Sequence, residues 1–347
     1  MTKKLIALVS VALLVFAACG GDSADVVTTP ETTAAEPPDT TTTTTEAVTS
    51  TAPVETTEAT VVEFEFTGDV IDTYVQNAGD FAGKEAADWD NAEVVQIELN
   101  EMSFTPNNLT FEAGKPYVVE LVNVGQVKHE VAAEHFFASV AWRKVESEQS
   151  EIKAPYFKEI EVFPGQTVEL FFVPISTGTF DVVCEIEGHL EAGMFGSIEV
   201  VGTPPTSPAP ILAPIAEGPW VANGAELVSA ADWDTMETIE VDMGEFYFAP
   251  DEIHLTVGQP YELLFINSGD VKHEATAGGL FETIALRKAE DASGEYKAPT
   301  LAEVETFAGA QTSVFLIPQE AGTYDLVCEI EGHFEAGMFG TIMVDEG

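Results

Sequence analysis

Short runs rich in β-branched and aromatic residues recur along the chain, and glycine and proline separate them. Examples are YVVELVN at 117–123, YELLFIN at 261–267, TVELFFV at 167–173 and TSVFLIP at 312–318. Such runs predict β-strands, and the intervening EAGKP, FPGQT and STGTF are typical of turns. Many short strands with turn signals between them indicate an all-β sandwich or barrel.

The sequence also repeats itself at an offset of 144 residues. AADWD at 86–90 recurs at 230–234, VKHE at 127–130 recurs at 271–274, and KAP at 153–155 recurs at 297–299. A repeat of this length predicts two copies of one domain. We place them at 62–201 and 220–347, with a linker at 202–219 whose GTPPTSPAP segment we expect to act as a hinge.

The N-terminal region predicts export. Lys3 and Lys4 precede an apolar run that ends in small residues, which is typical of a signal peptide at 1–18. Cys19 follows directly and resembles the lipidated cysteine of a bacterial lipobox. Residues 19–61 are rich in Thr, Pro, Ala and Glu and predict a disordered tether. We therefore expect an extracytoplasmic protein, anchored by a lipid to the outer face of the cell membrane, or else secreted or periplasmic.

The net charge of the chain limits which classes of partner are expected. The chain has 13 basic and 60 acidic residues, for a net charge of −47. Nucleic acid is excluded as an expected partner because phosphate backbones require clustered Lys and Arg. The acidity favours basic partners and is also what a saline habitat tolerates, and the sequence leaves both interpretations open.

The strongest motif is CEIEGHLEAGMFG at 184–196, which returns at 328–340 with one residue changed in thirteen. Phe180, Val182 and Cys184 alternate along a predicted strand, so the cysteine is expected to face the core. Thiolate, imidazole and thioether are soft ligands that suit copper. A second imidazole is available in each copy, 55 residues before the cysteine. The candidate ligand sets are His129, Cys184, His189 and Met194 in the first copy, and His273, Cys328, His333 and Met338 in the second.

The C-x4-H-x4-M loop, with PGQT and GTFDVVC or GTYDLVC before it, resembles the cupredoxins, the type 1 blue copper family. Its GH and GMFG elements are most similar to rusticyanin-like and sulfocyanin-like members, and the lipid anchor is similar to that of halocyanins. The resemblance covers 92–202 and 236–347. It implies two Greek-key β-sandwiches, one copper in each, and one-electron transfer to redox partner proteins that dock through a basic or apolar face. Glu130 and Glu274 depart from the family pattern, in which Asn or Ser often follows the first histidine.

Two-domain copper enzymes resemble the chain less well. Multicopper oxidases and copper nitrite reductases need further histidines, and they carry one directly before the cysteine, where this chain has Val183 and Val327. Of six histidines only His135 and His254 remain, and both are expected at the surface. The prediction is therefore an electron carrier and not an enzyme. Copper storage or delivery stays open as an alternative, and so does a degenerate relative of the two-domain oxidases and nitrite reductases.

Most of the few basic residues repeat with the motif. They are Lys128, Arg143, Lys144 and Lys153 in the first copy and Lys272, Arg287, Lys288 and Lys297 in the second. The favoured interpretation is pairing with nearby glutamates, which contributes little at a surface. The alternative is that these cations offset acidic groups near the metal.

Overall fold

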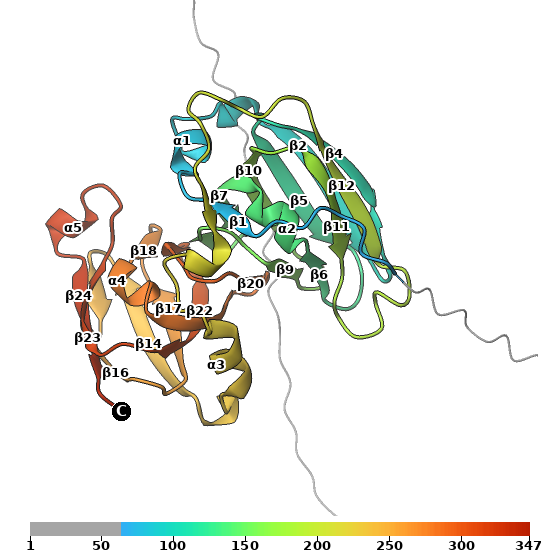
Figure 1. The fold of residues 1–347 in the computed structure, drawn as a ribbon. Helices are drawn as coiled ribbons and strands as arrows, with labels where there is room; N and C mark the ends of the chain where they lie inside the picture. The colour runs from blue at the N-terminus through green and yellow to red at the C-terminus, as the bar shows by residue number, and fades with distance from the viewer. Residues whose placement is uncertain (1–63) are drawn as a thin grey trace, which may run out of the picture. The chain divides into compact units, whose positions relative to one another are not determined.

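The computed structural model describes residues 64–347, and β-strands dominate them (Figure 1). The predicted signal peptide, Cys19 and the predicted tether at 19–61 lie outside the described residues. No helix within residues 64–347 is long and apolar enough to cross a membrane.

The first copy is a sandwich of two sheets, with an apolar core between them. Its first sheet contains β3 (Ser103–Thr105), β2 (Glu93–Asn100), β5 (Tyr117–Asn123), β10 (Thr167–Pro174), β7 (Val140–Glu146) and β8 (Ser150–Lys153), in that order. Its second sheet contains β4 (Asn108–Glu112), β12 (Phe195–Val201), β11 (Gly178–Val183), β6 (His129–Ala132) and β9 (Glu159–Val162). Strands with one buried face alternate as expected: in β4, Leu109 and Phe111 are buried between exposed neighbours.

The second copy repeats this plan from β14 onward, in yellow to red in Figure 1. One sheet contains β15 (Tyr247–Ala249), β14 (Glu237–Gly244), β17 (Tyr261–Asn267), β22 (Gln311–Pro318), β19 (Ile284–Glu290) and β20 (Gly294–Lys297). The other face is built from β16 (Glu252–Thr256), β24 (Phe339–Asp345), β23 (Gly322–Val327), β18 (His273–Ala275) and β21 (Glu303–Thr306). The prediction of an all-β fold of sandwiches is confirmed, and the expected strands at 117–123 and 261–267 are β5 and β17.

Helices are short and lie between strands. They are α1 (Gly79–Ala82), α2 (Glu134–Ala138), α3 (Gly224–Ala230), α4 (Gly278–Phe281) and α5 (His333–Ala336), with 3-10 turns η1 (Trp89–Asn91), η2 (Ile215–Glu217) and η3 (Trp233–Thr235). Within the predicted linker at 202–219, and after its GTPPTSPAP segment, β13 (Leu212–Pro214) pairs antiparallel with β1 (Thr73–Val75). Backbone hydrogen bonds thus hold part of the linker against the first copy.

The sheets of the two copies continue into one another, and both copies belong to one compact unit. β8 pairs with β21, with Ser150 opposite Thr306, and β9 pairs with β20, with Val162 opposite Gly294. β8 and β20 are repeat equivalents, and so are β9 and β21. The contact therefore follows an approximate twofold symmetry and yields sheets of eight and 11 strands.

The repeated lysines lie at this contact as partly buried ion pairs. Lys144 pairs with Glu151 at 2.7 Å, and its equivalent Lys288 pairs with Glu295 at 2.6 Å. Two further pairs cross between the copies, Lys153 with Glu303 and Lys297 with Glu159. Burial alone would raise the pKa of Glu151, but the ammonium groups of Lys144 and Lys153 lower it to about 2. The interpretation of these cations as partners of glutamates is confirmed for the repeated lysines, and much of that pairing is buried. Arg143 and Arg287 instead lie over the rings of Trp89 and Trp233.

Asp291 lies at the centre of the contact, where the first copy has Ser147. The carboxylate accepts hydrogen bonds from the hydroxyls of Ser147 at 2.7 Å and Ser150 at 2.5 Å, both in the first copy. It also accepts the backbone N–H groups of Ser293 and Gly294 and the hydroxyl of Tyr296. Asp291 is 6% exposed, so a single buried carboxylate satisfies five donors from the two copies.

Candidate metal centre

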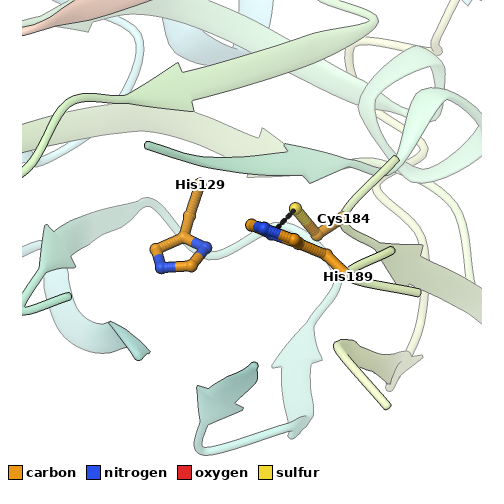
Figure 2. A group of neighbouring side chains, drawn as sticks. All are labelled: His129, Cys184 and His189. Atoms are coloured by element: carbon orange, nitrogen blue, oxygen red, sulfur yellow. Dashed lines mark hydrogen bonds between the residues drawn. The ribbon is translucent and has the colours of Figure 1, made fainter. Parts of the chain in front are cut away.

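Each copy brings three of its predicted ligands to one point. His129 in β6, Cys184 just after β11 and His189 in the following loop place their ligand atoms within 4.8 Å of one another (Figure 2). His273, Cys328 and His333 form the equivalent group. The cysteine sulfur lies 3.3 Å from His189 Nδ1 in the first copy and 3.4 Å from His333 Nδ1 in the second. A single ion of ordinary metal–ligand length fits between atoms so spaced.

The loop that carries cysteine, histidine and methionine is closed by its own backbone. In the first copy the Cys184 N–H donates to the Met194 carbonyl at 3.1 Å, and the Met194 N–H donates to the His189 carbonyl at 2.9 Å. Gly188 has φ 85°, a left-handed conformation that glycine adopts without strain. The loop of the second copy closes in the same way, with Gly332 at φ 87°.

Burial around the loop agrees with the strand pattern. Phe180, Val182 and Cys184 are all buried, as the alternation predicts, and Cys328 is fully buried in the second copy. Met194 and Met338 are also fully buried and belong to the apolar core, directly before β12 and β24. The structure thus places each methionine next to its loop and away from solvent.

The histidine from the distant strand lacks any protein partner. His129 and His273 are fully buried, and neither ring nitrogen of either residue has a hydrogen-bond partner. Burial first, and then the neighbouring His189, lowers the pKa of His129, so its imidazole is neutral at neutral pH. Burial and His333 lower the pKa of His273 likewise. Because unpaired buried nitrogens are costly, these lone pairs fit a metal ion better than an empty core.

The cysteine sulfurs each accept a backbone hydrogen bond. The N–H of Glu130 lies 3.5 Å from Cys184 Sγ, and the N–H of Glu274 lies 3.4 Å from Cys328 Sγ. Burial raises the pKa of both thiols, so the metal-free protein holds them protonated. A metal would displace that proton, and the N–H groups would then stabilise the thiolate.

Sequence reasoning missed a supporting asparagine in each copy. The buried Asn123 donates to the carbonyls of Val127 and Val162 and accepts the Gly125 N–H, which fixes the turn that leads to His129. Asn267 makes the same bonds before His273. The signal was present in the sequence, because both asparagines end an expected strand at equivalent positions.

Glycine is required at two positions near these asparagines, because a histidine ring lies against the backbone there. A Cβ at Gly125 would lie 2.8 Å from His129 Nε2, and one at Gly269 would lie 2.9 Å from His273 Nε2. Such contacts are too short for real side chains, so the first ligand histidine of each copy packs directly against backbone.

Glu130, which follows His129, is buried beside other acids. It is 5% exposed, and its Oε1 has no hydrogen-bond partner. Burial first, and then the charge of Glu159, raises the pKa of Glu130 to about 7.

The remaining histidines lie apart from both groups. His135 was expected at the surface but is half-buried, and its Nδ1 lies 3.2 Å from the backbone nitrogen of Ile71. His254 is exposed and contacts Glu252, as expected of a surface histidine.

Comparison with known proteins agrees with this geometry. Residues 80–195 match the family described as cupredoxin-like domain. The copper-resistant cuproprotein CopI of Rubrivivax gelatinosus is 29% identical over 108 residues, which make up 31% of this chain and 66% of CopI. The chain thus spans slightly less than two thirds of that relative's length.

Solved structures of larger copper proteins also match parts of the chain. A multicopper oxidase from Campylobacter jejuni matches at 11% identity and a TM-score of 0.29, covering 74% of this chain and 65% of the oxidase. The copper-containing nitrite reductase NirK from Thermus scotoductus matches at 17% identity and a TM-score of 0.26, covering 73% of this chain and 62% of the reductase.

These neighbours contradict the prediction that the chain is not an enzyme. Multicopper oxidases and copper nitrite reductases are enzymes, and chains of this fold are found among them. The prediction rested on a shortage of histidines, and such a count tests only sites that one chain builds alone. The prediction that the chain is not an enzyme is therefore wrong. What the family model shows is that residues 80–195, which include the first candidate ligand set, match a cupredoxin-like domain.

Proposed function

We propose that this chain transfers electrons one at a time through two copper sites, one in each copy. The proposed ligands are His129, Cys184, His189 and Met194, and His273, Cys328, His333 and Met338. The observation that carries the proposal is the pair of buried histidines whose ring nitrogens have no partner, each beside a cysteine and a second histidine. Copper bound there would supply a one-electron couple.

The protein holds the ligands in fixed positions and away from solvent. Backbone hydrogen bonds close the ligand loop, and the Glu130 and Glu274 N–H groups point at the sulfurs. Rigid ligands reduce the rearrangement that accompanies a change in the charge of the metal, and hydrogen bonds to the sulfur tune its electron-donating power.

Electron transfer is favoured over storage or delivery by the burial of the ligands. Both cysteines and both methionines are fully buried, and His129 and His273 are enclosed as well. An ion released to a partner needs ligands that solvent or the partner can reach. Here only the loop histidines approach the surface, which suits the passage of electrons better than the passage of ions.

Partner docking is proposed at the loop histidines, and most strongly at His333. Phe334 and Phe339 are about half exposed next to it, and the ring of Phe246 packs edge-on against His333 with centroids 5.1 Å apart. The residue equivalent to Phe334 in the first copy is Leu190. Exposed aromatic rings add contact area at interfaces, so the second copy should bind a redox partner with an apolar or basic face more tightly.

We also propose that the protein is extracytoplasmic and anchored to the membrane by a lipid on Cys19. Cys19→Ser should move the protein from the membrane fraction to the soluble fraction, because a lipid chain is the proposed attachment. Fractionation of cells followed by immunoblotting measures this. Unchanged membrane association would contradict lipidation and would favour an uncleaved N-terminal segment as the anchor.

Copper counting on the full chain tests the two-site proposal. We expect two copper ions per folded chain, strong visible absorption from thiolate-to-copper charge transfer, and reversible voltammetry. One copper per chain would reject the second site. Copper that chelators remove rapidly would favour delivery.

A further inference from the structure

A group of three carboxylates lies beside the first metal centre. Glu130 in β6, Glu159 in β9 and Glu185, directly after Cys184, each place a carboxylate oxygen within 4.8 Å of the others. Glu130 is 5% exposed and its Oε1 has no partner, whereas Glu185 is exposed to solvent. The group thus extends from a buried, unpaired oxygen to the surface.

Protein cations leave most of this charge uncompensated. Within residues 64–347, the ion pair that reaches the group is that of Lys297 with Glu159. When all three carboxylates are ionised, as cation binding requires, they and one ammonium carry a formal charge of −3 + 1 = −2. The neighbouring Glu161 pairs with Lys128, so neither the carboxylate of Glu161 nor the ammonium of Lys128 is available to the group.

In the second copy, a threonine hydroxyl pairs with the glutamate that is equivalent to Glu130. The equivalents of the three acids are Glu274, Glu303 and Glu329, and these do not gather into such a group in the described part of the chain. Glu274 Oε1 accepts the hydroxyl of Thr276 at 2.5 Å. The position of Thr276 is Ala132 in the first copy, which has no hydroxyl to offer. The first copy therefore leaves open an oxygen that the second copy satisfies internally.

We propose that Glu130, Glu159 and Glu185 bind a hard divalent cation, and that Ca²⁺ is the ion that fits. Ca²⁺ takes six to eight oxygen ligands in a flexible geometry, which suits three carboxylates that come from two strands and a loop. Mg²⁺ requires near-ideal octahedral geometry and usually keeps several waters, so it suits such a group less well. A charge of +2 also neutralises the formal −2.

The site is reachable from solvent. A surface hollow is lined by Ala132, Glu159 and Glu185, together with the acids Asp69, Glu134 and Asp181 and the cation Lys158. Water molecules in such a hollow can complete the six to eight ligands that Ca²⁺ prefers. The five acids of this lining outnumber Lys158, so the hollow attracts cations toward the group.

This ion would lie next to a proposed copper ligand, because Glu130 follows His129. This consequence rests on the proposed function: a positive charge there favours the lower charge of reduced copper, so Ca²⁺ should raise the reduction potential of the first site. The second site, which lacks the group, should not respond.

Calorimetric titration of the full chain with Ca²⁺ tests the binding itself, with copper present and again without it. Physiological ionic strength weakens diffuse binding to surface carboxylates. We expect one saturable site with a dissociation constant on the order of 10⁻⁴ M, in the range of weak extracellular sites. Glu185→Gln should weaken it by about tenfold or more, because one of three charged ligands is lost. Glu130→Gln should do the same.

Glu329→Gln is the matched control, since it makes the same change at the equivalent exposed position of the second copy and should leave the affinity unchanged. Absence of a saturable site, or an equal effect of Glu185→Gln and Glu329→Gln, would overturn the proposal. The titration without copper decides this even if the chain binds no copper, so failure here is distinct from failure of the proposed electron transfer.

Discussion

Cys184→Ser should remove about half of the visible absorption of the copper-loaded protein, because each copy contributes one thiolate and an alcohol is a far poorer donor to copper. Cys328→Ser should remove the other half, and the double variant should be colourless. Cys184 and Cys328 are both fully buried, each accepts a backbone N–H, and each lies beside a loop histidine. Absorption spectra at matched protein concentration, together with copper analysis, measure the effect.

The third cysteine provides a control with the same chemical change. Cys19→Ser alters no proposed ligand and should leave the spectrum unchanged. Full absorption in Cys184→Ser would show that this cysteine does not bind the metal. Loss of all absorption in either single variant would instead show that the two sites depend on one another.

Asp291→Ala should lower the free energy of unfolding by about 3–5 kcal/mol, because each donor that is left buried without an acceptor costs about 1–3 kcal/mol. The carboxylate accepts bonds from Ser147, Ser150 and Tyr296 and from two backbone N–H groups. Alanine would leave these donors buried and unpaired at the contact between the copies. Chemical denaturation of the full chain measures the loss, and we expect the two copies to unfold in separate transitions once the contact is weakened.

Ser147→Ala is the matched control at the repeat-equivalent position. It leaves the carboxylate with four donors, but it also removes the hydroxyl that accepts the N–H groups of Gln149 and Ser150. A loss of about 1–2 kcal/mol is therefore expected, smaller than that of Asp291→Ala. An Asp291→Ala variant that unfolds like the parent would contradict a central role for this carboxylate.

Much of the metal centre could be predicted from the sequence because its chemistry is local. Cysteine, histidine and methionine lie in one short loop, and strand alternation turns Cys184 toward the core. The repeat supplied the fourth candidate, His129, since only VKHE offers an imidazole at the same place in both copies. Asn123, which orders the turn before His129, was equally visible as a repeated residue. Its role depends on carbonyls that only the fold brings near.

The contact between the copies could not be predicted in this way. The sequence by itself determined that there are two β-sandwich copies with matching ligand loops, because hydrophobic alternation and motif spacing are properties of neighbouring residues. Only the tertiary structure decided that β8 pairs with β21 and β9 with β20. These strands are far apart in the sequence, and they pair because the fold brings their edges together. It also decided that Asp291, which breaks the repeat, meets Ser147 at the centre of that contact. Likewise, Glu130 and Glu274 are the same residue in the same motif. Glu274 accepts a hydrogen bond from the hydroxyl of Thr276, whereas the equivalent residue beside Glu130 is Ala132, which has no hydroxyl. The fold places these neighbours close enough for that difference to matter.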